Sequence, residues 1–170
     1  LVEDDPFWQE NLSADLNQEQ DIEVVCIASS KAAAVEAYNQ TEVDVVLMDI
    51  NLTENQLDGL EATQAIFSGS RGNVKIIMIT SLAEKEVIMK SFQSGAMNYI
   101  TKSSYKDIVR AVREAYANKS GIHPDVASIM RQEIELMTLT PMEREVCDLR
   151  ESCMSKTQIA DRLHKSVNTI

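Results

Sequence analysis

From about residue 20 onward, the chain alternates short apolar runs with longer stretches of helical periodicity. Four apolar runs occupy residues 22–28, 43–48, 75–80 and 97–101. Between and after them, apolar residues recur at helical spacing over residues 31–40, 60–67, 84–94 and 105–118. Runs that are apolar on both faces and separated by helices are typical of a parallel sheet covered on both sides. The pattern therefore predicts an α/β domain with right-handed crossovers.

The start of the chain adds one strand end and one helix start to this pattern. We expect Leu1 and Val2 to be the end of a strand whose earlier residues are missing. Asp5 and Pro6 then have the order of an N-cap residue and a first-turn proline. The sequence thus predicts a helix that begins directly after the first strand.

Beyond residue 119 the pattern changes to closely spaced helix starts. Residues 125–137 can form an amphipathic connecting helix. Thr140-Pro-Met-Glu143 and Ser155-Lys-Thr-Gln158 each have the spacing of a capping box, and Ser166 could cap a third helix. Two short helices, a tight turn and the start of a third predict a helix-turn-helix that is cut off before its recognition helix.

Charge is distributed unevenly along the chain, whose formal net charge is −11. Residues 1–100 carry 17 acidic and 5 basic side chains, whereas residues 101–170 carry 10 and 11. The acidic first part argues against docking of nucleic acid or an anionic membrane there, because phosphates need cations opposite them. The near-neutral remainder stays eligible for nucleic acid.

Several classes of protein are disfavoured by what the sequence lacks. No apolar run reaches the roughly 18 residues of a membrane helix, and no secretory signal is visible. Cys26, Cys147 and Cys153 are odd in number and form no C-x-x-C pair, which disfavours disulfides and zinc and favours a reducing cytoplasm. The five glycines form no nucleotide-binding loop.

Carboxylate, hydroxyl and lysine side chains follow the predicted strands at their carboxyl ends. In chain order they are Glu3-Asp4-Asp5, Asp49, Thr80-Ser81 and Thr101-Lys102. Ligands of doubly wound sheets bind at this edge, where the carboxylates would converge and repel one another. A hard cation, most plausibly Mg²⁺, together with Lys102 would offset that repulsion.

These residues predict a phosphoryl-transfer site in which Asp49 forms an acyl phosphate, because no nucleotide loop is present. A plainer alternative is that acidic strand ends only cap the following helices. That alternative explains Asp5 well. It explains Asp49 less well, because an irregular segment follows it.

Seven segments of the sequence resemble a known family. VEDDP, VVLMDINL, DGLEA, IIMITS and GAMNYITK resemble the strand-end motifs of the response-regulator receiver domain. LTPMEREVCDL and SKTQIADRLHKSVNTI resemble the start of a LuxR-type helix-turn-helix domain. Together they are similar to the NarL/FixJ class of two-component transcription factors.

The resemblance implies a doubly wound, parallel, five-stranded flavodoxin-like sheet, then a linker helix and a partial all-α helix-turn-helix domain. The domain limits it implies are 1–118 for the receiver, 119–138 for a partly helical linker and 139–170 for an incomplete DNA-binding domain.

The same resemblance implies roles for individual residues. Asp49 matches the phosphoacceptor that takes a phosphoryl group from a sensor histidine kinase. Glu3 and Asp4 match the acidic pair that binds Mg²⁺, and Asn51 matches the residue whose main-chain carbonyl also ligates the metal.

Three further positions match residues that respond to the phosphoryl group. Thr80 matches the hydroxyl that hydrogen-bonds it, and Lys102 matches the lysine that contacts its oxygens. Tyr99 matches the aromatic residue whose rotamer is coupled to that hydroxyl. Phosphorylation would add anionic oxygens that Thr80 can follow, which would change the packing near Tyr99.

The sequence departs from the family pattern in three places. Thr53 replaces the proline usual four residues after the phosphoacceptor, and the loop before Asp58 is about two residues longer. Ser103 stands where many receivers have a cis-proline. Cys153 replaces the glycine usual in the first turn of the helix-turn-helix, so that turn is expected to be distorted or extended if it needs a positive φ.

The leading hypothesis is a phosphorylation-switched, DNA-binding transcription factor that is not an enzyme, forms a homodimer on activation and binds no membrane. Lys165, Ser166 and Thr169 are candidates for DNA backbone contacts near a helix N-terminus. A phosphoacceptor module with a protein-binding output remains an alternative. A small phosphatase is disfavoured because Asn51 occupies the place of its second carboxylate.

Overall fold

The computed structural model describes residues 1–53, 57–70, 74–119 and 121–169. The chain divides into two compact units, residues 1–127 and 128–170, and each is described by itself. The predicted domain limits 1–118, 119–138 and 139–170 divide the chain differently and stay a prediction.

In chain order the elements are α1 (Pro6–Asn17), α2 (Lys31–Gln40), β1 (Val45–Met48), α3 (Asp58–Gly69), β2 (Lys75–Thr80), α4 (Lys85–Gln93), β3 (Asn98–Thr101), the 3-10 helix η1 (Lys102–Asp107), α5 (Ile108–Tyr116), α6 (Pro124–Leu136), α7 (Pro141–Glu151) and α8 (Lys156–Arg162).

The first unit is built on a parallel sheet of three strands in the order β1-β2-β3. Two isolated bridges join Val2 to Ala28 and to Met48, both parallel. Met48 pairs with Met78, and Met78 pairs with Tyr99. One row of paired residues therefore crosses five segments of the chain, three as strands and two as single bridges.

The five-stranded sheet implied by the resemblance is thus only partly present as strands. The apolar run at residues 22–28 is not a strand, and of its residues only Ala28 forms a bridge in the described structure. Within this run, the Cys26 carbonyl accepts a hydrogen bond from the Leu1 amino group at 2.9 Å, and Ala28 makes backbone hydrogen bonds with Leu1 and Glu3. A cavity of about 760 Å³ is lined by Ile22, Val24, Val45 and Leu16 among others.

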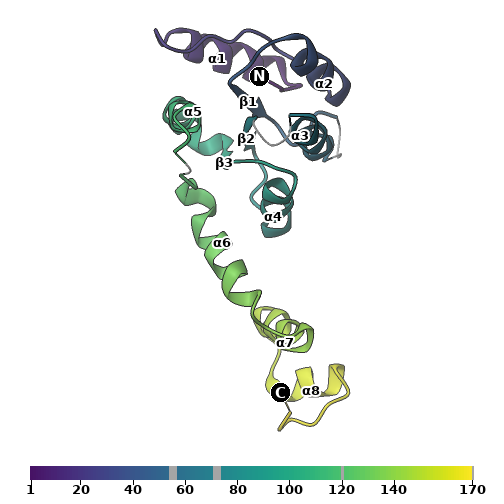
Figure 1. Cartoon of the computed structure of the whole chain (residues 1–170). Helices are drawn as coiled ribbons and strands as arrows, with labels where there is room; N and C mark the ends of the chain where they lie inside the picture. The colour runs from purple at the N-terminus through teal and green to yellow at the C-terminus, as the bar shows by residue number, and fades with distance from the viewer. Residues whose placement is uncertain (54–56, 71–73, 120, 170) are drawn as a thin grey trace. The chain divides into compact units, whose positions relative to one another are not determined.

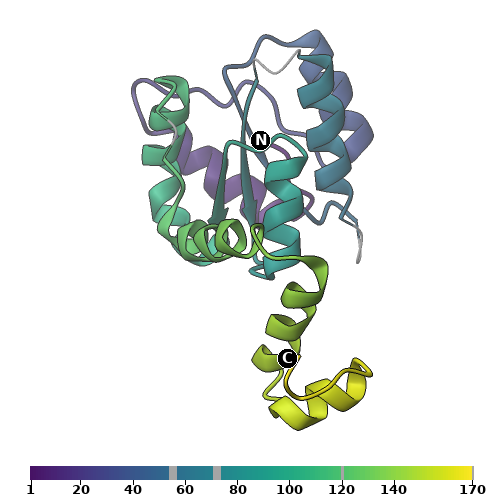
Figure 2. The same ribbon diagram turned by 60° about the horizontal axis from the view of Figure 1, so that its bottom comes forward.

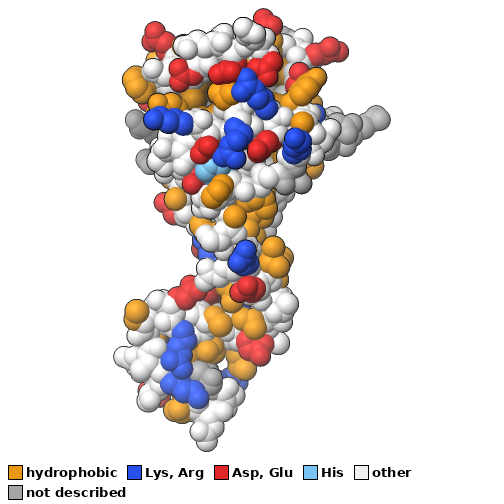
Figure 3. Space-filling view, turned by 90° about the vertical axis from the view of Figure 1, so that its left-hand side faces the viewer, with side chains coloured by type: hydrophobic (Ala, Val, Ile, Leu, Met, Phe, Trp, Pro, Cys, Tyr) orange, Lys and Arg blue, Asp and Glu red, His pale blue; other side chains and the backbone are white. Residues whose placement is uncertain are grey.

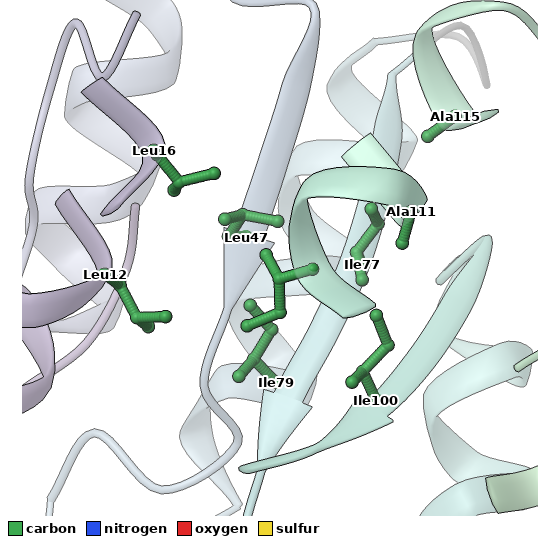
Figure 4. Packing of buried hydrophobic residues seen from close by; sticks show 9 residues of the cluster. Leu12, Leu16, Leu47, Ile77, Ile79, Ile100, Ala111 and Ala115 are labelled. Atoms are coloured by element: carbon green, nitrogen blue, oxygen red, sulfur yellow. The ribbon is translucent and has the colours of Figure 1, made fainter. Parts of the chain in front are cut away.

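Helices cover both faces of the sheet, with α1 and α5 on one face and α2, α3 and α4 on the other (Figures 1 and 2). Figure 4 shows that the side chains of the first face point toward one another from α1, the strands and α5. That cluster comprises Leu12, Leu16, Leu47, Ile77, Ile79, Ile100, Ile108, Ala111 and Ala115. Because the strands are buried on both faces, their runs read as continuously apolar, as the sequence predicted.

The surface beside α5 carries many charged side chains of both signs (Figure 3). Arg113 lies 2.6 Å from both Glu19 and Asp21, and Arg110 lies 2.8 Å from Asp107. All five side chains are at least one-third exposed, so solvent screens these pairs. Part of the acidic excess of the first unit is therefore paired with arginine at its surface.

The second unit consists of helices whose starts are locally determined. Thr140 and Ser155 each form the predicted capping box, with Glu143 and Gln158 respectively. Cys153 adopts a left-handed conformation with φ of 60°. The turn before α8 therefore keeps the backbone conformation that glycine favours, although a cysteine occupies it.

None of the described helices combines the length and the apolar character that a membrane span needs.

Candidate functional site

The carboxyl ends of the parallel strands bring the predicted site residues together. Asp49 follows β1 directly, Thr80 ends β2, and Lys102 follows Thr101 at the end of β3. Thr80 and Thr101 are register partners, so these ends lie level with one another. Parallel strands place their carboxyl ends at one edge, which is where the sequence predicted the site.

Lys102 lies between two buried carboxylates. Its Nζ is 2.8 Å from Asp49 Oδ2 and 2.7 Å from Glu3 Oε2. Burial by itself would lower the pKa of Lys102, but the hydrogen bonds to Asp49 and Glu3 raise it above its ordinary value. The lysine is therefore held as a cation, and it supplies the positive charge that the neighbouring carboxylates need.

Three carboxylates form a cluster beside this lysine. Glu3, Asp4 and Asp49 can each place one oxygen within 4.8 Å of the others. Glu3 and Asp49 are buried, whereas Asp4 is exposed. Burial raises the pKa of Glu3 to about 7, a rise that the Lys102 hydrogen bond opposes and the Asp49 charge increases. A set of hard oxygen donors with one open side fits Mg²⁺.

The backbone around Asp49 is packed closely against α3. The Gly59 N–H donates to the Ile50 carbonyl at 2.9 Å, and a Cβ at Gly59 would lie 1.9 Å from the Asp49 carbonyl oxygen. No side chain fits there without displacing the strand end. Asp49 Oδ1 accepts a 2.6 Å hydrogen bond from the Ile50 N–H, so Lys102 and Ile50 hold the two carboxylate oxygens.

Thr80 and Tyr99 share a partner in the loop after β2. The Leu82 N–H donates to Thr80 Oγ1 at 3.4 Å, and the Tyr99 hydroxyl donates to the Leu82 carbonyl at 2.8 Å. Tyr99 is fully buried, and burial, together with the charges of Glu84 and Asp49, raises its pKa. The structure thus links the two residues through Leu82.

The segment after Asp49 is described only in part. Asn51 is half-buried and lies two residues beyond Asp49. Asp58 accepts hydrogen bonds from the Leu52 N–H at 2.9 Å and the Thr53 hydroxyl at 3.0 Å. The predicted lengthening of the loop falls on residues 54–56, which lie outside the described residues.

Two features of this site were not predicted from the sequence. The Trp8 ring lies over Lys102, with Nζ 5.1 Å from the ring centroid, and it also contacts Tyr105 edge to face. His123 is buried and contacts Asp107 and Asp125. The Trp8–Lys102 and His123–Asp107 contacts join residues far apart in sequence, and only the His-Pro-Asp order at the start of α6 could have drawn attention to His123.

The three candidate DNA contacts lie in the second unit and are exposed. Lys165, Ser166 and Thr169 follow the left-handed residue His164. The hydroxyls of Ser166 and Thr169 are 2.7 Å apart, and the Thr169 N–H donates to the Ser166 carbonyl. These residues form a turn, and Ile170 lies outside the described residues.

Comparison with protein families gives one matching model. Residues 1–113 match the model described as the response regulator receiver domain. This match includes the strand-end cluster and α1 to α4, and it ends within α5.

Comparison with curated proteins extends the similarity to the whole chain. The response regulator protein VraR of Staphylococcus saprophyticus subsp. saprophyticus is 31% identical over 176 residues, which cover 100% of this chain and 83% of that protein. VraR of Staphylococcus epidermidis is 30% identical over the same shares.

Two solved structures resemble this chain. A LuxR-family two-component response regulator from Aurantimonas sp. SI85-9A1 has a TM-score of 0.70 and 28% identity, over 78% of this chain and 93% of that one. A structure of RcsB dimers bound to DNA has a TM-score of 0.70 and 19% identity, over 99% and 83%. The second likeness indicates the fold alone.

Proposed function

This chain belongs to the response regulator receiver family, and we propose that it is a phosphorylation-switched transcription regulator and not an enzyme. In this proposal Asp49 accepts a phosphoryl group from a sensor histidine kinase. The observation that carries the proposal is the buried pairing of Asp49 with Lys102 at the carboxyl end of the sheet. That pairing places a nucleophilic carboxylate and a charge-neutralising cation at one point.

The transfer itself needs few protein groups. A lone pair on an Asp49 carboxylate oxygen attacks the phosphorus of a phosphohistidine, the P–N bond breaks, and its electron pair remains on the imidazole nitrogen. Lys102 neutralises charge on the transferred oxygens, because its ammonium is already 2.8 Å from Asp49 Oδ2. Catalysis of this kind is mostly positioning and electrostatic stabilisation.

Glu3, Asp4 and Asp49 would hold Mg²⁺ beside this carboxylate, with the Asn51 main-chain carbonyl as a further ligand. When bound, the ion would neutralise charge that develops on the phosphoryl oxygens. The observation that supports this metal site is that the three side chains can place carboxylate oxygens within 4.8 Å of one another, with Glu3 and Asp49 buried.

The switch would run through Thr80 and Tyr99. A phosphoryl group on Asp49 presents new anionic acceptors to the Thr80 hydroxyl. When Thr80 turns toward them, its 3.4 Å contact with the Leu82 N–H is lost. Tyr99 is bonded to the carbonyl of the same residue, so the loop after β2 would transmit the change to the tyrosine.

The output would be DNA binding by a homodimer through the second unit. RcsB, which shares the fold, has been solved as dimers bound to DNA. Lys165, Ser166 and Thr169 are exposed in the second unit and would contact the DNA backbone. Binding of this kind would weaken steeply as salt is raised.

Asp49→Asn tests the phosphoacceptor assignment. An acyl phosphate is cleaved by hydroxylamine, so the wild-type chain should gain hydroxylamine-labile label from acetyl phosphate in the presence of Mg²⁺. The variant should gain less than about one-hundredth of that label, because it lacks the nucleophilic oxygen. Asp44→Asn, an exposed change five residues upstream, should label like the wild type.

Retention of label by Asp49→Asn would refute the proposal. The output is measured separately, as the salt-dependent binding of labelled protein to double-stranded DNA. Phosphorylation without any gain in dimerisation or DNA affinity would favour a receiver whose output is protein binding.

A further inference from the structure

The first turn of α6 is attached to the junction of β3 and η1, which carries Lys102. The Asp125 side chain accepts hydrogen bonds from the Thr101 N–H at 3.3 Å, the Thr101 hydroxyl at 2.7 Å and the Ser104 hydroxyl at 3.3 Å. The Thr101 hydroxyl lies a further 2.7 Å from that of Ser103. One carboxylate therefore holds the chain on both sides of Lys102.

Asp125 is in turn held by its neighbours at the start of α6. The Asp125 N–H donates to His123 Nδ1 at 3.3 Å, and His123 Nε2 lies 3.2 Å from Asp107. The His123 N–H donates to Asn98 Oδ1 at 2.9 Å, where β3 begins. The first turn of α6 is thus tied to β3, which ends directly before Lys102, and to η1, which begins with Lys102.

The carboxylate at the centre of these contacts is charged. Burial would raise the pKa of Asp125, but the hydrogen bonds from Thr101 and Ser104 outweigh it and lower the pKa. Hydrogen bonds to a charged acceptor are roughly twice as strong as neutral ones. The charged Asp125 carboxylate therefore holds Thr101 and Ser104 more strongly than a neutral acceptor with the same number of hydrogen bonds would.

We propose that Asp125 is a positioning residue for Lys102 and that it couples the phosphoacceptor site to the first turn of α6. The inference rests on the proposed function, because it assigns a regulatory connection to that same site. Displacement of Lys102 toward phosphoryl oxygens on Asp49 would alter the contacts of Thr101 and Ser104 with Asp125. Coupling between two sites is reciprocal, so a change at Asp125 alters the site in return.

Asp125→Ala and Asp125→Asn test this coupling in the full chain, with acetyl phosphate and Mg²⁺ as the probe. The alanine variant should label about fivefold more slowly, because Lys102 loses the support of its neighbours. The asparagine variant should recover most of the rate, since its amide oxygen still accepts from the Thr101 hydroxyl. Glu135→Ala, which removes an exposed carboxylate from the same helix, should leave the rate unchanged.

A second readout follows Lys102 directly. Trp8 is the only tryptophan of the chain, and its ring lies 5.1 Å from Lys102 Nζ. Asp125→Ala should therefore change the emission of Trp8 in the unphosphorylated protein, and Asp125→Asn should restore it. If Asp125→Ala only unfolded the first turn of α6 and did not move Lys102, the emission of Trp8 would stay unchanged.

Thr101→Val removes the hydroxyl donor and leaves the carboxylate in place, so it tests the inference even if Asp125→Ala does not fold. It should slow labelling as well, and the two changes together should cost less than the sum of their separate effects. Normal labelling rates and unchanged Trp8 emission in Thr101→Val and in folded Asp125→Ala would overturn the inference. Failure of the proposed function is distinguishable, because the wild-type chain itself would then take no label.

Discussion

The helices of the two units differ in how many of their starts are fixed by side-chain caps. In the first unit, Asp5 and Ser30 cap α1 and α2, whereas α3, α4 and α5 begin without a side-chain cap hydrogen bond and each buries at least two residues. In the second, α7 and α8 both begin with a complete capping box; α7 has no buried residue, and α8 buries two. A helix that packs on a sheet is stabilised by burial and can dispense with a cap. A helix without a buried residue, such as α7, relies more on bonds within its own first turn.

The two units also differ in net charge. Residues 1–127 carry 10 basic and 20 acidic side chains, net −10, and residues 128–170 carry 6 and 7, net −1. The first unit uses part of its negative charge in the cluster of Glu3, Asp4 and Asp49. The second unit has no basic excess over these residues, so the proposed DNA contacts depend on where its few cations lie.

Ile77→Ala should have the largest effect on stability. Ile77 is fully buried in β2 within the core cluster, and truncation of a buried isoleucine typically destabilises by about 2–5 kcal/mol because a cavity remains. Urea unfolding followed by Trp8 fluorescence measures this loss, since Trp8 packs against the same cluster. The matched change Ile27→Ala, in the same unit at a side chain that is 45% exposed, should cost markedly less, because less apolar surface is buried there. Equal losses at the two positions would contradict the dominance of burial in the first unit.

Thr140→Ala should have an intermediate effect that is confined to α7. The Thr140 hydroxyl accepts from the Glu143 N–H, and loss of an N-cap typically costs about 1 kcal/mol. Hydrogen exchange of the first-turn amides of α7 should therefore become several-fold faster. Thr157→Ala, at an exposed position inside α8, should leave exchange in α7 unchanged.

The same capping box has a defined pH dependence. Hydrogen bonds from Thr140 lower the pKa of Glu143 below its ordinary value of 4.5. The contribution of the carboxylate is therefore complete above pH 4.5 and is lost as the pH falls through the lowered pKa. Exchange in α7 that is independent of pH across this range would show that the box contributes nothing.

Cys153→Gly should have the smallest effect, and it should be a gain. Cys153 has a φ of 60°, a conformation that costs a residue with a side chain about 1–2 kcal/mol, while glycine loses part of that advantage through its larger unfolded-state entropy. The net expectation is a stabilisation of up to about 1 kcal/mol in thermal unfolding of the chain. Cys147→Gly, inside α7, should instead destabilise by about 1 kcal/mol. A loss at both positions would show that the left-handed turn is not strained.

The helix starts and the strand ends could be predicted from the sequence because both are local properties. The Asp5 cap and the two capping boxes depend on side chains two or three residues from the amides they bind. Asp49, Thr80 and Lys102 could be placed at one sheet edge because parallel strands align their carboxyl ends. To predict where these three residues lie, only the order of strands and helices along the chain was needed.

The partners of these residues were decided by the tertiary structure. The run at residues 22–28 has strand composition, but a strand needs a continuous ladder, and in the described structure the run forms only the Ala28 bridge. Asp125 is one of many acidic residues by sequence, and its contact with Thr101 crosses 24 positions. Such contacts depend on how separate elements pack, because no short-range pattern encodes the distance between them. The sequence by itself determined where most helices begin and which chemical groups follow β1, β2 and β3, whereas the packing of the first turn of α6 decided which carboxylate holds Thr101 and Ser104 on either side of Lys102.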